Sequence, residues 1–257
     1  INLLMTTQLE APLDFCWLMV ETGMHRLGLA MKKCEGALEQ LSTSSNIIGQ
    51  VGLMSHFANA DTIADPRNTQ QLTHLKQFIA QDNIPTSMAN SAAILSYPDS
   101  HGDWLRPGLM LYGISPFEDQ SAYDFNLKPV MRLQSQITAI QQVKTGDQVG
   151  YGGDWIAQQE TRIAIVSIGY GDGYSRQLSN AGRVVVHDEL VDVIGRVSMD
   201  MIAIDITMLH NVNIGDAVTL WGNDQLLVET VAQRANTIPY ELVCQVSDRV
   251  IREYKDG

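Results

Sequence analysis

The sequence has little cysteine, no long apolar run and no secretion pattern. Its three cysteines, Cys16, Cys34 and Cys244, are odd in number and show no CxxC spacing, so we expect neither a disulfide framework nor a zinc or other metal site. No apolar run approaches the roughly 18 residues of a membrane span. No segment has the basic, apolar and small-residue order of a signal peptide. These absences predict a soluble protein of the reducing cytoplasm without a membrane partner.

Basic charge is also scarce. The 257 residues include 17 Lys and Arg against 29 Asp and Glu, a net charge of −12 at pH 7, which argues against nucleic acid or anionic membrane as a partner. A local group of arginines could still bind a small anion. Charged residues make up only 18% of the chain and apolar residues 45%. This composition excludes a disordered chain and predicts one large or two medium domains.

The first half of the sequence alternates between apolar runs and helical patterns. We expect strands at 13–20, 47–54, 84–88 and 109–114, and helices at about 29–41 and 69–81. This alternation is typical of βα units around a parallel sheet. A closed eight-stranded barrel needs roughly 250 residues, whereas about four units precede residue 115. Residues 1–118 are therefore predicted to form the second half of a (β/α)8 TIM-type barrel.

Short strands replace the helical patterns after residue 124. The candidates lie at 131–143, 161–168, 183–187, 190–196, 201–206 and 216–221, with a hairpin turn at 187–189 and a short helix at 228–235. We predict an all-β C-terminal domain over 124–257. Residues 118–124 form the expected linker. The fold class is thus α/β plus all-β.

Tyr170 stands at the centre of the most distinctive stretch, IAIVSIGYGDGYSR (163–176). An apolar run typical of a buried strand breaks into a turn with three glycines around one tyrosine, which leaves no bulk beside the ring. Such a turn at a strand end is where α/β scaffolds carry chemistry. The alternative is a glycine-rich hairpin with a half-buried aromatic residue.

Further polar residues follow the other predicted strands, and each also has a structural interpretation. His56 could be a core histidine, Arg26 a helix cap or surface ion pair, and Asn90-Ser91 a helix N-cap. Arg106-Pro107-Gly108 is an ordinary turn, and Tyr240 could be a packed aromatic residue. Each cluster alone favours its structural interpretation, whereas the common position of the first four at strand ends of one predicted sheet argues for a shared pocket.

These clusters lie in eight segments with compatible order and spacing. The segments are ETGMHRLG (21–28), MSHFANAD (54–61), ANSAA (89–93), WLRPGLMLYG (104–113), VGYGG (149–153), SIGYGDGYSR (167–176), IGRVSMDM (194–201) and Tyr240-Glu241-Leu242. Together they resemble the bacterial alanine racemases, which are pyridoxal 5'-phosphate enzymes built from an eight-stranded α/β barrel and a β domain. The resemblance implies an isomerase that interconverts L-alanine and D-alanine and supplies D-alanine for peptidoglycan.

The resemblance implies a catalytic role for three residues. Tyr170 resembles the base that removes the α-proton of L-alanine, with His56 and Arg106 as a relay behind it. A phenol has an ordinary pKa of about 10 and is a poor base at neutral pH, so it needs hydrogen-bonding or cationic neighbours. Arg106 also resembles the arginine on the pyridine nitrogen. A guanidinium only donates hydrogen bonds, so that nitrogen stays unprotonated and the ring is a weaker electron sink.

Binding roles and a partner follow from the same resemblance. The cofactor-binding residues implied are Arg26 at the phenolic oxygen, Arg106 at the pyridine nitrogen, and Ser91, Gly108, Leu109 and Tyr240 at the phosphate. Arg26 and the Met199 N–H resemble the groups that hold the substrate carboxylate, with Asp200 beside them. In this family the β domain completes the active site of the partner subunit. We therefore expect a head-to-tail homodimer in which Tyr170 acts in trans.

The largest departure from the family is a missing lysine. The family's second base, which also forms a Schiff base with the cofactor, lies in a motif such as VxKANAYGHG, and none of the six lysines, Lys32, Lys33, Lys76, Lys128, Lys144 and Lys255, has that context. The chain also starts Ile-Asn-Leu without an initiator methionine. We expect it to be the C-terminal part of a racemase. A half-barrel exposes strand edges and should aggregate or pair.

Two substitutions and three alternatives complete the interpretation. Met19 replaces a lysine that often supports Arg26 in the family, and Glu21 replaces an aspartate. The alternatives are a racemase of broader substrate range, a cofactor-binding and dimerisation fragment without activity, and a structural β-barrel interaction domain. The presence of Tyr170, Met199-Asp200 and Tyr240 together argues against the last.

Overall fold

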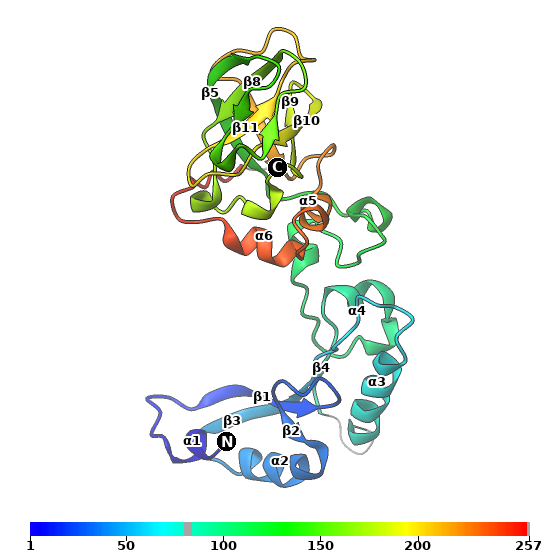
Figure 1. Cartoon of the computed structure of the whole chain (residues 1–257). Coiled ribbons are helices and arrows are strands. Elements are labelled where there is room, and N and C mark those ends of the chain that lie inside the picture. Colours follow the sequence, from blue (N-terminus) through cyan, green and yellow to red (C-terminus); the bar gives the residue numbers. More distant parts are fainter. Residues whose placement is uncertain (80–83, 256–257) are drawn as a thin grey trace. The chain divides into compact units, whose positions relative to one another are not determined.

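The computed structural model describes residues 1–79 and 84–255. The chain divides into two compact units (Figure 1). The first comprises Ile1–Met110 and Pro116–Asp119, and the second comprises Leu111–Ser115 and Gln120–Gly257. Their main division, between Asp119 and Gln120, lies within residues 118–124. No helix within the described ranges is long and apolar enough to cross a membrane.

The first unit is built on a parallel sheet with the strand order β2-β1-β3-β4. Its elements are α1 (Asn2–Thr6), β1 (Leu13–Glu21), β2 (Leu29–Ala30), a 3-10 helix (Met31–Lys33), α2 (Cys34–Ser42), β3 (Ile47–Met54), α3 (Pro66–Ile79), β4 (Thr86–Ser87), α4 (Ser91–Ser96) and a 3-10 helix (Pro98–Ser100). Strands β1 and β3 pair in parallel register, with Leu18 opposite Leu53. The parallel strands predicted at 13–20, 47–54 and 84–88 are confirmed.

The two faces of β1 differ in burial because successive side chains of a strand point to opposite sides. Leu18 and Val20 are buried, and α2 packs against β1 and β3 (Figure 1). Phe15 and Trp17 alternate with them and are half-buried. Their ring centroids lie 4.8 Å apart, and Trp104 lies 6.2 Å from both. The second face of the sheet therefore carries an aromatic cluster.

Two local predictions for the first half of the chain are wrong. The apolar run predicted as a strand at 109–114 contains a 3-10 helix over Leu109–Tyr112. An apolar run of this length fits either structure by pattern alone, and here the Met110 N–H donates to the Ser91 hydroxyl instead of to a strand. The helix expected from residue 29 begins at Cys34, because Leu29–Ala30 pairs with β1. Residues 80 and 81 of the helix predicted at 69–81 lie outside the described residues.

The second unit is a closed antiparallel barrel with the strand order β10-β11-β8-β5-β12-β9. Its strands are β5 (Leu133–Val143), β8 (Thr161–Val166), β9 (Arg183–Val186), β10 (Glu189–Ile194), β11 (Ile202–Asp205) and β12 (Ala217–Trp221), while β6 (Gln148–Val149) pairs with β7 (Trp155–Ile156). The six predicted strands are confirmed to within a few residues. Ala164, Val184, Ile204, Val218 and Leu220 are fully buried.

Turns and short helices close the second unit. The hairpin between β9 and β10 turns at His187 and Asp188, whose φ angles of 48° and 64° are typical of a two-residue hairpin loop, as predicted. Helix α5 (Val228–Arg234) confirms the predicted helix. Helix α6 (Pro239–Gln245) was not predicted; it begins with proline, which is favourable at the first helical position. Further 3-10 helices cover Ala122–Phe125, Tyr151–Gly153, Tyr170–Asp172 and Arg176–Leu178.

Candidate active site

The polar residues predicted in the first unit follow the carboxyl ends of its strands. Residues 22–26 follow β1, Ser55 and His56 follow β3, and residues 88–91 follow β4. Arg106 follows Trp104, which forms a parallel bridge to Ser87. Because the strands are parallel, these ends share one edge of the sheet, which is where α/β enzymes place their active sites.

Arg106 is the most heavily bonded residue at this edge. One guanidinium nitrogen, Nη1, donates to the Ser87 hydroxyl at 2.5 Å. The other, Nη2, donates to the Ser55 carbonyl at 2.6 Å and lies 3.2 Å from His56 Nδ1. Its Nε–H makes no hydrogen bond to the residues that the structure describes. The side chain is thus fixed in position and keeps one donor unused.

His56 is held as a neutral imidazole. Burial lowers its pKa, and the positive charges of Arg106 and Arg26 lower it further. A guanidinium can only donate, so Nδ1, which faces Arg106, is the acceptor. The ring proton therefore sits on Nε2. The structure places the charges of Arg26 and Arg106 close enough to act on His56.

Arg26 lies in an exposed loop that Glu21 organises. The Glu21 carboxylate accepts hydrogen bonds from the backbone N–H groups of Gly23 and His25, the latter at 2.7 Å. His25 adopts a φ of 55° to allow this turn. Met19 is half-buried on β1 two residues before Glu21. The predicted role of Glu21 as a replacement for aspartate is therefore physically reasonable, since a carboxylate at this position closes the loop.

Sequence reasoning missed the buried residue that joins these loops. Gln71 of α3 donates from Nε2 to the Thr22 hydroxyl at 3.2 Å and to the His56 carbonyl at 2.9 Å. Its Oε1 accepts from the Ala58 N–H at 3.0 Å. Thr22 and Ser55 share a further hydrogen bond of 2.7 Å. The only signal in the sequence is a polar residue on the apolar side of a helix.

Ser91 is the centre of the predicted phosphate-binding group. Its hydroxyl oxygen accepts from the N–H groups of Gly108 at 2.8 Å and Met110 at 3.3 Å. The hydroxyl proton is left to donate outward, and the Leu109 N–H makes no recorded bond within the described chain. The Gly108 N–H, predicted as a phosphate donor, is occupied by Ser91 here.

These donors fit the cofactor that the resemblance implies. A phosphate needs several donors, which the Ser91 hydroxyl and the Leu109 N–H can supply. An unprotonated pyridine nitrogen needs one donor that keeps its proton, which the free Nε–H of Arg106 supplies. Among the described residues, no group of three His, Cys, Asp or Glu side chains could hold a metal ion. The donor set therefore suits an anionic aromatic cofactor.

The second unit contains a pocket of about 780 Å³ that collects three predicted residues. Tyr170, Met199 and Asp200 line it, together with Tyr151, Arg176, Val197 and Ser198. Tyr170 is 45% exposed, so its ring is open to the pocket. The Met199 N–H makes no recorded hydrogen bond within residues 1–79 and 84–255. It is therefore available to a carboxylate.

Two neighbouring turns form one wall of this pocket. The Tyr170 N–H donates to the Ser198 carbonyl at 3.0 Å, and the Gly171 N–H donates to the Met199 carbonyl at 2.9 Å. A Cβ on Gly169 would lie 2.2 Å from the Ser198 oxygen, so only glycine allows this approach. Gly173 has a φ of +104°, which favours glycine for conformational reasons. Gly173 thus supplies a backbone angle that other residues rarely adopt, and Gly169 allows a close approach of the two turns that the sequence did not predict.

Tyr151 is the second phenol of the pocket and was not singled out from the sequence. It is 71% exposed and begins the short turn Tyr151–Gly153. The Arg196 guanidinium pairs with Asp154, and this pairing lowers the pKa of the Asp154 carboxyl. A Cβ on Gly152 would lie 2.7 Å from Arg196 Cζ, so the guanidinium lies against the Tyr151 turn. The VGYGG segment was the signal that could have identified it.

Tyr240 does not line the pocket that contains Tyr170. It is the second residue of α6 and is 43% exposed. Its hydroxyl makes no recorded bond within the described residues. Its predicted role at the phosphate therefore stays a prediction.

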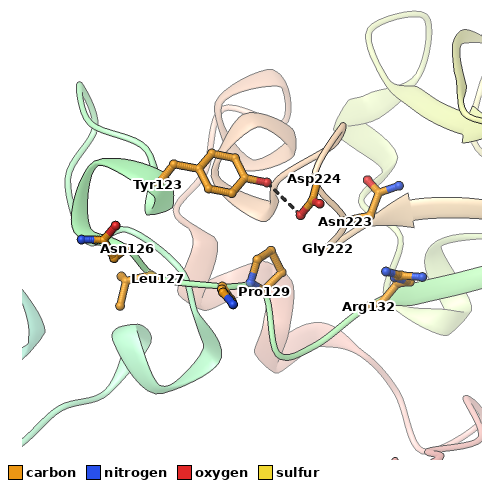
Figure 2. Close-up of a pocket in the computed structure, with 9 residues that line it drawn as sticks. Tyr123, Asn126, Leu127, Pro129, Arg132, Gly222, Asn223 and Asp224 are labelled. Carbon is orange, nitrogen blue, oxygen red and sulfur yellow. Dashed lines mark hydrogen bonds between the residues drawn. The ribbon is translucent and has the colours of Figure 1, made fainter. Parts of the chain in front are cut away.

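A further pocket of about 480 Å³ contains none of the predicted residues. Figure 2 shows Tyr123, Pro129, Arg132 and Asp224 around it. The Tyr123 hydroxyl donates to Asp224 at 3.0 Å. Burial raises the pKa of Tyr123, and its bond to Asp224 raises it further. This second pocket has no counterpart among the sequence predictions.

Comparisons with known proteins identify relatives of the whole chain. The family models "Alanine racemase, N-terminal domain" and "Alanine racemase, C-terminal domain" match residues 7–116 and 130–254. The alanine racemase of Legionella pneumophila strain Lens is 47% identical over 247 residues, which are 96% of this chain and 69% of that protein. The relatives therefore match both units but are longer than this chain.

Solved structures agree with the sequence relatives. The biosynthetic alanine racemase from Pseudomonas aeruginosa superposes with a TM-score of 0.90 at 41% identity, over 96% of this chain and 68% of that chain. An alanine racemase from Bartonella henselae with covalently bound pyridoxal phosphate superposes with a TM-score of 0.83 at 31% identity, over 94% and 66%. The chain thus spans about two thirds of the length of these proteins.

Proposed function

Because the chain belongs to the alanine racemase family, we propose that its two units hold the cofactor and the substrate for the interconversion of L-alanine and D-alanine. The family is a pyridoxal-phosphate-dependent family of isomerases. The observation that carries the assignment of sites is the Arg106 network, in which a fixed donor-only side chain lies beside a neutral His56. The cofactor, when bound, supplies the electron sink for loss of the α-proton.

In the first unit, we propose that Arg106 and His56 set the protonation states of the pyridine nitrogen and of the catalytic phenol. When the cofactor is bound, the Arg106 Nε–H would donate to the pyridine nitrogen and would leave it unprotonated, since a guanidinium does not release its proton. His56, neutral and protonated on Nε2, can donate a hydrogen bond from Nε2 that stabilises a phenolate, without carrying a charge beside the two arginines. Arg26 binds the cofactor's phenolic oxygen and the substrate carboxylate. Ser91 and Leu109 bind the phosphate, with Gly108 and Tyr240 as further predicted contacts.

In the second unit, we assign the base to a phenol of the Tyr170 pocket. Tyr170 is the residue predicted from the sequence, and Tyr151 lines the same pocket with a larger exposed fraction. The free Met199 N–H holds the substrate carboxylate, with Asp200 beside it. A base must lie within hydrogen-bond reach of the proton that it removes, and both phenols open into this pocket.

We propose that the two half-sites meet across a head-to-tail homodimer. The Tyr170 pocket of one subunit then completes the Arg106 site of the other. A closed two-fold dimer has an isologous interface, in which residue i of one subunit contacts residue j of the other and the reverse, so each subunit gives one half-site and receives another. The scattered cysteines support a cytoplasmic location for this dimer.

The second base of the reaction has no candidate among the lysines of this chain. The relatives are longer than this chain. We propose that the active protein takes its second base from a segment that corresponds to this additional length. Isolated as it stands, the chain would be a cofactor-binding and dimerisation fragment. Absorbance of the bound cofactor before and after borohydride separates these cases, because only a lysine Schiff base is reduced to a stable covalent adduct.

The test of the base assignment uses Tyr170→Phe and Tyr151→Phe in the full-length protein. We expect Tyr170→Phe to lose conversion that starts from L-alanine while keeping cofactor binding, because Phe removes only the hydroxyl. The other variant serves as its matched control in the same pocket. If both variants convert L-alanine at the original rate, neither phenol is the base and the assignment fails.

The substrate range is a separate question of pocket size. A racemase with a broader range is the alternative, since one methylene changes discrimination by only about 1–3 kcal/mol. Rates with alanine, serine and 2-aminobutyrate would distinguish the two. A preference for alanine of less than about tenfold, equal to 1.4 kcal/mol, would favour the broader enzyme.

A further inference from the structure

Arg249 lies behind the Tyr170 pocket without lining it. Its Nη2 donates to Asp200 Oδ1 at 2.5 Å and lies 3.3 Å from Asp172 Oδ1. Asp200 follows Met199 in one turn of the pocket wall, and Asp172 belongs to the turn that carries Tyr170. A single guanidinium therefore joins the two turns through their carboxylates.

Asp172 connects this ion pair to the backbone of the Tyr170 turn. Its second oxygen, Oδ2, accepts from the Gly169 N–H at 2.9 Å. A Cβ on Gly171 would lie 2.6 Å from Arg249 Nη1, so the guanidinium also lies directly against the peptide after Tyr170. A shift of the Arg249 side chain would therefore change the packing and hydrogen bonding of the turn that carries Tyr170.

Charge gives Arg249 a second effect on the same turns. Asp172 and Asp200 are like charges in adjacent turns, and the side chain of Asp172 is only 14% exposed, so water screens their repulsion poorly. Within the described residues, no other cation forms an ion pair with either carboxylate. The hydrogen bond to Asp200 raises the pKa of Arg249 and the negative charge of Asp172 raises it further, so the guanidinium stays charged.

We propose that Arg249 is a positioning residue that sets the gap between the Tyr170 phenol and the Met199 N–H. This inference rests on the proposed function, in which the Met199 N–H binds the substrate carboxylate and a phenol of the same pocket removes the α-proton. Without Arg249 the two turns separate, although Tyr170 and Met199 are chemically unchanged. A misplacement of about 1 Å costs on the order of 10²-fold in rate.

The kinetic test compares Arg249→Gln, Arg249→Lys and the control Arg183→Ala in the full-length enzyme. Arg183 forms an exposed ion pair with Asp192 on β9 and β10 and lies outside the pocket. We expect Arg249→Gln to raise the KM for alanine and to lower kcat/KM by roughly 10²-fold. Arg249→Lys should recover part of this loss because it keeps the charge, and Arg183→Ala should match the original enzyme.

A double variant separates charge balance from simple loss of packing. Asp172→Asn removes one of the repelling charges and keeps an acceptor for the Gly169 N–H. If Arg249 balances charge, Arg249→Gln with Asp172→Asn should be more active than Arg249→Gln alone, which is the reverse of additive damage. A double variant that is less active than the single variant would overturn the proposal.

Hydrogen exchange gives a readout that does not depend on activity. We expect Arg249→Gln to speed exchange of the Gly169, Tyr170 and Gly171 amides by at least about tenfold, since all three bond within the two turns. Arg183→Ala should leave these amides unchanged. Unchanged exchange in Arg249→Gln would overturn the positioning role, whatever the base proves to be. Faster exchange with unchanged KM and kcat would overturn its link to the reaction.

Discussion

Gly169→Ala tests the close contact that holds the Tyr170 turn against the Met199 turn. The added Cβ would lie 2.2 Å from the Ser198 oxygen, 2.4 Å from the Met199 oxygen and 2.5 Å from the Met199 carbonyl carbon. Ordinary van der Waals contact begins near 3.4 Å. All three neighbours are backbone atoms, so the two turns must move apart by about 1 Å. Gly169 has a φ of −154°, so the substitution carries no conformational penalty of its own.

The expected loss of stability has two parts. Overpacking of this size costs about 1–3 kcal/mol. Weakening the hydrogen bonds from the Tyr170 and Gly171 N–H groups costs about 0.5–1.5 kcal/mol each. Because the movement that relieves the overlap is the movement that weakens the bonds, the two costs are partly shared. We expect a net loss of about 2–4 kcal/mol, which lowers the Tm by roughly 4–16 °C.

Calorimetry of the full chain measures this loss, with Gly36→Ala as the matched control. Gly36 lies in α2, and nothing lies within 4 Å of the Cβ that the same substitution would add there. Alanine is the better helix former, so the control should gain up to about 1 kcal/mol. If Gly169→Ala loses less than about 0.5 kcal/mol while the control behaves as expected, the turns are not in the contact described.

Three other predictions use unfolding measurements on the same chain. Gln71→Leu should cost about 2–4 kcal/mol because it leaves the Ala58 N–H and the His56 carbonyl without the partner that Gln71 supplies. Gln70→Leu, on the exposed side of α3, is the control, and equal losses would refute the network. The pKa of His56 is lowered in the folded chain, so the unfolded chain takes up its proton first and stability should fall as the pH drops below about 6.5. His56→Gln should remove this component of the pH dependence, and an unchanged profile between the two proteins would contradict it. Tyr174→Phe should leave stability unchanged or raise it by up to about 1 kcal/mol, since the buried hydroxyl has no hydrogen-bond partner among the described residues, and a clear loss in urea unfolding would show that it has one.

Local pattern was enough for most of the fold. The apolar runs of β1 and β3 and the six strands of the barrel were predictable because strand periodicity and turn residues agree with the tertiary structure there. The half-barrel with a β domain, and the alanine racemase family, are confirmed by the relatives. The strand prediction for the segment after Gly108 failed because an apolar run of six residues suits a strand or a helix. Only the hydrogen bond to Ser91 decides between them.

The candidate site was predictable as a set of residues but not as a set of contacts. The sequence indicated His56 and Arg106, whereas their 3.2 Å contact and the tautomer that it requires depend on two loops 50 residues apart. Gln71 belongs to no recognisable sequence motif. It joins the loops after β1 and β3 only because the fold places α3 next to both of them. Tyr151 was visible within a matching segment, but its position in the Tyr170 pocket needed the barrel to close.

The sequence by itself determined the family, the order of the secondary structures and the residue types available for chemistry. These properties depend on side-chain identity and on spacing along the chain, which a sequence states directly. The tertiary structure alone decided which donors are free, which phenols share a pocket and which arginine joins the turns that form its wall. Those facts depend on distances between residues far apart in the chain, and such distances are set only when the sheet edge and the barrel are packed.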